Sequence, residues 1–346
     1  MTTDTNRTQS SHETDFSTLT ELSTRHPLGR SEDQPYQRKQ ERFKDRLWVN
    51  LILFLITIVT TTTVGALHHA AFLSNFESSS SPSPLFSWEM LTGGTWYSLT
   101  ILAILGCHEM GHYLACRYYR VSASLPYFLP APILLTGTLG AFIRIRERIP
   151  TKRMLFDIGI AGPIAGFVVA TPALLVGLSL SRTVALPHDF VGLSLGEPLL
   201  FKAATWAIWG PIQEGYSLNL HPMAFAAWFG LLATALNLFP IGQLDGGHIA
   251  YAVFGRRSTF LTLLTVGLTI VLTFFSLSWL VWTILTIIML LSFGIRHPKT
   301  LDDHIPLDRN RRLVAWSALF MFVVCFTPNP IEPLELLNTQ PIDASL

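Results

Sequence analysis

The chain alternates between long apolar runs and short polar segments. Seven runs approach the roughly 20 residues that a helix needs to cross a bilayer. They are Leu47–Leu67, Trp96–Cys116, Met154–Leu180, Pro222–Phe239, Thr259–Phe275, Leu277–Phe293 and Leu313–Phe326. Only Ser276 separates the fifth run from the sixth, so these two could form a tight helical hairpin. The pattern predicts an all-α, polytopic (multi-pass) membrane protein with about seven transmembrane helices.

A further apolar stretch, Val121–Ile143, has a different character. It contains three prolines and two glycines, which a helix interior tolerates poorly. Over Gly140–Arg146, successive residues alternate with a period of two, so their side chains would face opposite sides of a β-strand. Non-helical backbone at membrane depth has to be buried in protein or line a wet cavity. We therefore predict a re-entrant loop with a β-hairpin, lying beside a polar cavity.

The few charged residues mark the two sides of the membrane. Only 14% of the residues are charged, against about 25% in a soluble domain, which argues against a water-soluble globular protein. Basic residues gather before the first run, between the second and third, and after the fourth and sixth, whereas the outer loops hold only Arg182 and Lys202. The positive-inside rule then predicts a cytoplasmic N-terminus. A net charge of +1 offers no basic face, so no nucleic-acid partner is expected.

The second apolar run contains the sequence His108-Glu109-Met110-Gly111-His112, an H-E-x-x-H pattern. Two histidines four residues apart on a helix project from one face and can share a metal ion. Glu109 lies beside that face and can act as general base on a metal-bound water. An ionisable residue inside a transmembrane helix is costly, and is a functional candidate for that reason. The alternative is two packing histidines with a protonated or paired glutamate.

Two histidines leave a zinc site one protein ligand short. The fourth run ends in Asn237-Leu-Phe-Pro240-Ile-Gly-Gln-Leu-Asp245-Gly-Gly-His248, in which Pro240 breaks the helix. Both motifs lie near the cytoplasmic ends of their runs, so Asp245 can face the histidine pair. Two histidines and one carboxylate form a known hydrolytic zinc ligand set. Asp245 could instead, or in addition, cap a helix over Gly246–Phe254.

These motifs resemble those of a known family. The residues His108–His112 and Asn237–Gly247 look like the paired H-E-x-x-H and N-x-x-P-x-x-x-L-D-G signatures of the site-2 protease family, peptidase family M50. The stretches Gly137–Phe142 and Asp157–Gly166 are similar to the middle of that family. The resemblance covers about residues 95–255.

The resemblance is strongest to the branch with several spans and no PDZ domain, because the loop at 181–221 is too short for one. It implies an intramembrane zinc metalloprotease. In such an enzyme His108, His112 and Asp245 would be the zinc ligands and Glu109 the catalytic residue.

The chain is expected to have five parts. They are a disordered cytoplasmic tail at 1–46, a first transmembrane helix and outer loop at 47–95, a catalytic membrane core at 96–256, C-terminal transmembrane helices at 257–327, and a short tail at 328–346. The tail at 1–46 is polar and lacks the apolar segment of a signal peptide. Within the core, Pro198–Trp209 could lie flat in the outer interface or be a plain connector.

The leading interpretation is a zinc-dependent metalloendopeptidase that hydrolyses peptide bonds in or near transmembrane segments of membrane proteins. A metal-activated water would attack, with Glu109 as general base. The substrate helix has to unwind, and the strand Gly140–Arg146 could receive it by edge pairing. Asn237, Gly140 and Arg144 are candidate substrate-positioning residues, although Asn237 could equally hydrogen-bond another helix. The expected location is the lipid bilayer of a bacterial cytoplasmic membrane.

Two other functions fit parts of the pattern. A membrane metal transporter could use His and Asp within its spans as a transit site, but it would not need Glu109. A catalytically silent scaffold would keep the fold without the reaction. Whether His248 or His221 assists the metal site stays open, as does the oligomeric state.

Overall fold

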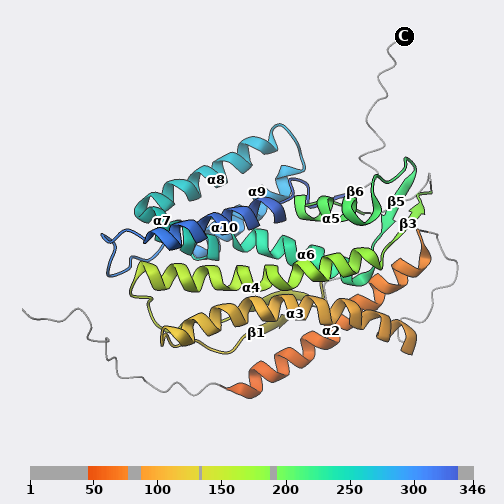
Figure 1. Ribbon diagram of the computed structural model, residues 1–346. Helices are drawn as coiled ribbons and strands as arrows, with labels where there is room; N and C mark the ends of the chain where they lie inside the picture. The colour runs from red at the N-terminus through yellow and green to blue at the C-terminus, as the bar shows by residue number, and fades with distance from the viewer. Residues whose placement is uncertain (1–45, 77–86, 132–134, 188–192, 334–346) are drawn as a thin grey trace, which may run out of the picture. The chain divides into compact units, whose positions relative to one another are not determined.

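The computed structural model describes residues 46–76, 87–131, 135–187 and 193–333, most of them in helices (Figure 1). Its helices are α2 (Leu47–Ser74), α3 (Trp88–Tyr118), α4 (Lys152–Ser179), α5 (Leu199–Trp209), α6 (Pro222–Asn237), α7 (Asp245–Phe254), α8 (Ser258–Thr273), α9 (Trp279–Phe293) and α10 (Arg309–Cys325). Apart from Arg46, the predicted disordered tail at 1–46 lies outside the described residues, as does most of the predicted tail at 328–346.

Helices α2, α3 and α4 are long and apolar enough to cross a membrane, with 28, 31 and 28 residues. They correspond to the first three predicted spans. Helices α6, α8, α9 and α10 correspond to the other four, but they have 16, 16, 15 and 17 residues. At 1.5 Å per residue they are about 23–26 Å long, shorter than a hydrocarbon core of about 30 Å. The count of seven spans therefore stays a prediction.

Helix α3 begins at Trp88, about two turns before Trp96, where the second predicted span begins. The side chain of Ser87 accepts a hydrogen bond from the amide of Met90 at 3.3 Å, and Glu89 lies in the first turn. Both features stabilise a helix N-terminus. The polar residues of this turn lower its hydropathy without interrupting the helix.

The strands form antiparallel pairs (Figure 1). These are β1 (Tyr127–Pro130) with β2 (Thr138–Phe142), β3 (Arg182–Ala185) with β5 (Tyr216–Asn219), and β4 (Leu193–Leu195) with β6 (Ile331–Pro333). The β1–β2 pair lies within the segment for which a re-entrant β-hairpin is predicted.

The predicted strand Gly140–Arg146 is wrong in its limits, because β2 covers Thr138–Phe142. Beyond β2 the chain pairs with a different segment. The hydroxyl of Ser124 accepts a hydrogen bond from the amide of Arg144 at 2.9 Å, and the amide of Ser124 donates to the carbonyl of Arg144 at 3.0 Å. Because the Arg144 amide donates its hydrogen bond to the Ser124 side chain, it does not pair with β1, and the β1–β2 ladder ends before this residue.

Helices α3, α4 and α6 pack against one another and enclose the main apolar core (Figure 1). Tyr97, Ile104, Leu174 and Trp228 are buried there. By contrast, α2, α8 and α9 expose many large apolar side chains. Such a surface suits a lipid solvent better than water.

Within the segment Pro198–Trp209, residues Leu199–Trp209 form α5. Pro198 precedes the first turn and Gly210 follows the last one with a φ of 67°, as at many helix ends. The side chain of Trp206 is exposed. Whether α5 lies flat in the interface stays a prediction.

Candidate metal centre

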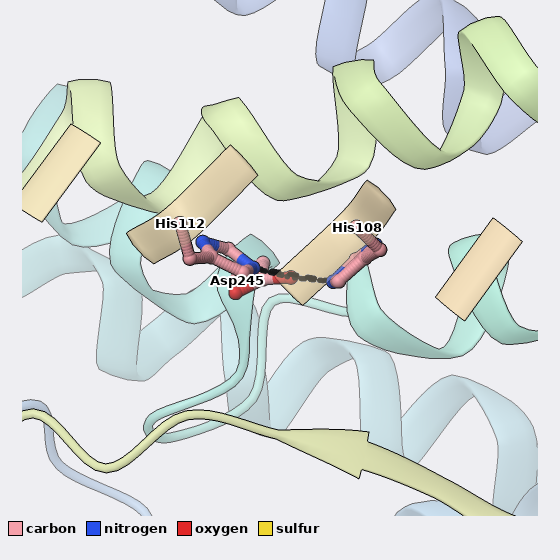
Figure 2. Close-up of side chains that lie close together, drawn as sticks. All are labelled: His108, His112 and Asp245. Atoms are coloured by element: carbon pink, nitrogen blue, oxygen red, sulfur yellow. Dashed lines mark hydrogen bonds and ion pairs between the residues drawn. The ribbon is translucent and has the colours of Figure 1, made fainter. Parts of the chain in front are cut away.

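Helix α3 presents His108 and His112 one turn apart on the face that packs against α4 and α6. Both side chains are buried, with exposed fractions of 5% and 7%. Their spacing of four residues aligns the two rings, as expected from the helical period. Figure 2 shows the rings turned toward a common point.

Asp245 reaches the same point from the first residue of α7. Helix α6 ends at Asn237, and a tight turn follows in which Gly242 has a φ of +48°. This turn redirects the chain so that α7 starts beside α3. The residue that caps α7 is Leu244, without a side-chain hydrogen bond, so the alternative of Asp245 as the helix cap is wrong.

Three donor atoms converge at this centre (Figure 2). Oδ2 of Asp245 lies 3.1 Å from Nε2 of His108 and 3.2 Å from Nε2 of His112, and the two nitrogen atoms are 3.2 Å apart. Ligand atoms about 2.0–2.2 Å from a tetrahedral zinc ion are separated by about 3.3–3.6 Å. The spacing is therefore close to that of a zinc site. Within the described residues, this is the group of three histidine and acidic side chains placed to share a metal ion.

The surroundings of His112 orient its ring. Nδ1 lies 2.7 Å from the carbonyl oxygen of Ile158, and a carbonyl can only accept. Nδ1 therefore carries the proton, and Nε2 keeps its lone pair for a metal. Space for the ring comes from Gly162 of α4, where an added Cβ would lie 2.1 Å from Nε2 of His112.

Glu109 follows His108 on α3 and is also buried, with 8% of its surface exposed. Its Oε1 lies 4.0 Å from Nε2 of His108, too far for a hydrogen bond. The backbone amide of Ile143, just after β2, also interacts with this carboxylate. The carboxylate of Glu109 thus lies between the three potential metal ligands and the end of the β1–β2 hairpin.

The predicted substrate-positioning residues Asn237, Gly140 and Arg144 have different surroundings. Nδ2 of Asn237 is 3.2 Å from Nε2 of His108, which is the interhelical contact expected as the alternative to a substrate role. Gly140 lies in β2 with a φ of +106°, and an added Cβ would meet nothing within 4 Å. Arg144 is exposed, and its backbone amide is held by the hydroxyl of Ser124.

His221 and His248 are not brought into the group of three. His221 caps α6 at the end opposite Asn237, and its Nδ1 accepts a hydrogen bond from the amide of Met223 at 3.2 Å. Nδ1 of His248 lies 2.7 Å from Nε2 of His297. Sequence reasoning had missed His297, because a histidine in a polar connection has no spacing that links it to the motifs.

Sequence reasoning also missed how α2 holds the hairpin. The side-chain amide of Asn50 donates to the carbonyls of Leu125 and Pro126 at 3.1 and 3.0 Å. The hydroxyl of Thr60 donates to the carbonyl of Gly137 at 2.7 Å. These contacts fix both ends of the β1–β2 hairpin to one helix. Polar residues in an apolar run were the available signal.

Several known proteins are similar to this chain. The family described as Peptidase family M50 matches residues 96–278. The probable zinc metalloprotease EGY2, chloroplastic, of Oryza sativa subsp. indica is 32% identical over 261 residues, which are 72% of this chain and 46% of that protein. The probable zinc metalloprotease EGY1, chloroplastic, of Arabidopsis thaliana is 30% identical over 237 residues, 64% of this chain and 42% of that protein.

The chain thus spans about half the length of the curated relatives it matches. No solved structure matches it. The family match includes α3 from Trp96 onward, the hairpin, α4, α6 and α7, and therefore every residue of the group of three.

Proposed function

Because the chain belongs to peptidase family M50, the site-2 protease family, we propose that it is a zinc-dependent intramembrane endopeptidase. It would hydrolyse peptide bonds in or near transmembrane segments of membrane proteins. One observation carries the proposal: the donor atoms of His108, His112 and Asp245 lie 3.1–3.2 Å apart, with Glu109 beside them. A metal ligand set with an adjacent carboxylate is what hydrolysis by an activated water requires.

His108, His112 and Asp245 would hold the zinc ion. A zinc ion held by these three side chains would supply a Lewis acid and lower the pKa of water. Glu109 takes a proton from the attacking water and gives it to the leaving amine. Asn237, whose Nδ2 lies 3.2 Å from Nε2 of His108, would turn to donate a hydrogen bond to the substrate backbone or to the oxyanion. The apolar helices around the site exclude bulk water.

The substrate enters as an extended peptide, because the peptide bonds of an intact helix are shielded by their own hydrogen bonds. The β1–β2 hairpin is suited to receive it, since β2 ends just before Ile143, whose amide interacts with Glu109. A peptide added to β2 would therefore run toward the catalytic carboxylate. Gly140 and Arg144 would contribute backbone and side-chain contacts to this peptide.

Replacing Leu139 by proline tests this entry route. Proline has no amide hydrogen, so the change removes one backbone donor from β2. Because the side chain of Leu139 is exposed, little packing is lost. We expect cleavage of a transmembrane substrate to fall about tenfold, with zinc content unchanged. The control Leu139→Thr keeps the amide and should behave like the wild type. Unchanged cleavage by the proline variant would argue against strand addition.

Zinc content tests the metal centre itself. The full chain, purified in detergent, is expected to hold about one zinc ion, and His112→Ala should remove it because only two ligands remain. A chelator should stop cleavage of a model transmembrane substrate, and added zinc should restore it. Cleavage that persists in the metal-free protein would refute the proposal. Zinc bound without any cleavage would instead favour transport or a scaffold.

We further propose that the chain crosses a bacterial cytoplasmic membrane about seven times. The support is the distribution of basic residues, from which the positive-inside rule predicts that the N-terminus and the metal-centre end of α3 lie on the cytoplasmic side. Its surroundings would be the lipid bilayer and its substrates membrane proteins, with no nucleic-acid partner. Between α4 and α6 the described residues form β3, β4, α5 and β5, which is compatible with the branch that lacks a PDZ domain.

A further inference from the structure

A second histidine pair lies one helical turn beyond the metal centre. His248 follows Asp245 on α7, and its Nδ1 lies 2.7 Å from Nε2 of His297. The two rings meet edge to face, with centroids 4.9 Å apart and an interplanar angle of 82°. His297 belongs to the connection between α9 and α10, outside the region that the family match covers.

The direction of this hydrogen bond follows from its neighbours. Nδ1 of His297 lies 2.6 Å from the carbonyl oxygen of Pro298, so Nδ1 has to donate. Burial lowers the pKa of His297, which favours the neutral ring. A neutral ring that donates through Nδ1 accepts through Nε2. His248 therefore donates its Nδ1 proton to His297.

The connection that carries His297 is itself fixed to α4. The amide of Leu301 donates to the carbonyl of Pro150 at 2.8 Å. The amide of Lys152 donates to Asp302, also at 2.8 Å, and its ammonium group donates to the carbonyl of Asp303 at 2.6 Å. His297 thus belongs to a connection that is also hydrogen-bonded to the start of α4.

The same connection contacts α7 a second time. The ring of Tyr251 stacks on that of His297, with centroids 4.5 Å apart, and its hydroxyl donates to Asp303 at 2.8 Å. Helix α7 has no side-chain cap, and it lies close to α4 at Gly159, where an added Cβ would be 2.9 Å from Cβ of His248. The rotation of α7, and with it the direction of Asp245, depends on contacts of this kind.

We propose that His297 is a positioning residue, which orients the Asp245 carboxylate toward the histidines of α3 by accepting a hydrogen bond from His248. This inference rests on the proposed metal centre. It assigns a function in metal binding to the α9–α10 connection, far along the chain from both motifs. Groups that hold a metal ligand in place commonly matter about 10- to 100-fold for metal affinity.

Two substitutions separate the hydrogen bond from the packing. His297→Phe keeps a ring against Tyr251 and loses the acceptor, whereas His297→Gln keeps an acceptor near the position of Nε2 and loses the ring. Lys299→Ala, at an exposed site of the same connection, is the control. Each full-length protein is titrated with zinc against a competing chelator, and its cobalt-substituted form is examined by visible absorption.

We expect His297→Phe to bind zinc about tenfold more weakly and to shift the cobalt spectrum, with kcat reduced and KM unchanged. His297→Gln should stay within about threefold of the wild type, and Lys299→Ala should equal it. In a His248→Leu background, His297→Phe should add no further loss, because its partner is gone. If His297→Phe does not fold, His297→Asn, too short to reach His248, replaces it with the same expectation.

Each outcome points to one proposal. A wild-type protein that binds no zinc refutes the metal centre itself. If the wild type binds zinc and His297→Phe has the same zinc affinity and cobalt spectrum, the proposed role of His297 is overturned. Equal losses in the Phe and Gln variants overturn it as well, because the acceptor that Gln keeps would then have no effect on zinc binding.

Discussion

Glu109→Gln should abolish cleavage while leaving zinc bound. Gln has nearly the same shape as Glu but cannot accept a proton from water at neutral pH. General base catalysis contributes about 10²- to 10⁴-fold, so we expect turnover of a model transmembrane substrate to fall by about 10³-fold. Oε1 of Glu109 lies 4.0 Å from Nε2 of His108 and outside the group of three donors, so zinc content should not change.

A matched control comes from the same helix. Glu89→Gln makes the same chemical change in the first turn of α3, at an exposed side chain far from the metal centre. It should cleave like the wild type. Residual cleavage by Glu109→Gln equal to that of Glu89→Gln would remove Glu109 from the mechanism. Loss of zinc from Glu109→Gln would show that the carboxylate helps to hold the metal.

The parts of the site that could be predicted from sequence are those with a local period. His108 and His112 share a face because a helix repeats every 3.6 residues, whatever surrounds it. Asp245 was placed opposite them by counting spans and matching depth, and the structure brings it within 3.1 Å of His108. Pro240, in the turn before α7, made the end of the preceding helix predictable. Each of the seven long apolar runs likewise corresponds to a helix of the structure.

The remainder depended on contacts between distant segments. Beyond the end of β2, the hydroxyl of Ser124 accepts a hydrogen bond from the Arg144 amide, and no alternation within the strand reveals that contact. The start of α3 depends on the cap at Ser87 rather than on hydropathy. His297 becomes meaningful only beside His248. Side-chain hydrogen bonds across the fold leave no period in the sequence, so patterns alone could not predict them.

Gly162→Ala should remove zinc without unfolding the protein. Alanine is favoured over glycine inside a helix by about 1 kcal/mol, so α4 itself should gain stability. The new Cβ, however, would lie 2.1 Å from Nε2 and 2.4 Å from Cδ2 of His112. The ring has to move, and its bond from Nδ1 to the carbonyl of Ile158 opposes that movement. We expect zinc affinity to fall at least tenfold and cleavage to be lost with it.

Two other glycines show whether the loss is specific to the metal centre. Gly267→Ala lies in α8, where an added Cβ meets nothing within 4 Å, so it should be neutral or slightly stabilising with zinc unchanged. Gly111→Ala would place its Cβ 2.5 Å from the backbone oxygen of Ala161, which cannot turn aside, and should lower the Tm. All Tm values are compared in chelator, since bound zinc stabilises the folded state by itself. A Gly162→Ala variant that binds zinc like the wild type would show that His112 has room to move, and that the close approach of α4 does not fix the ligand.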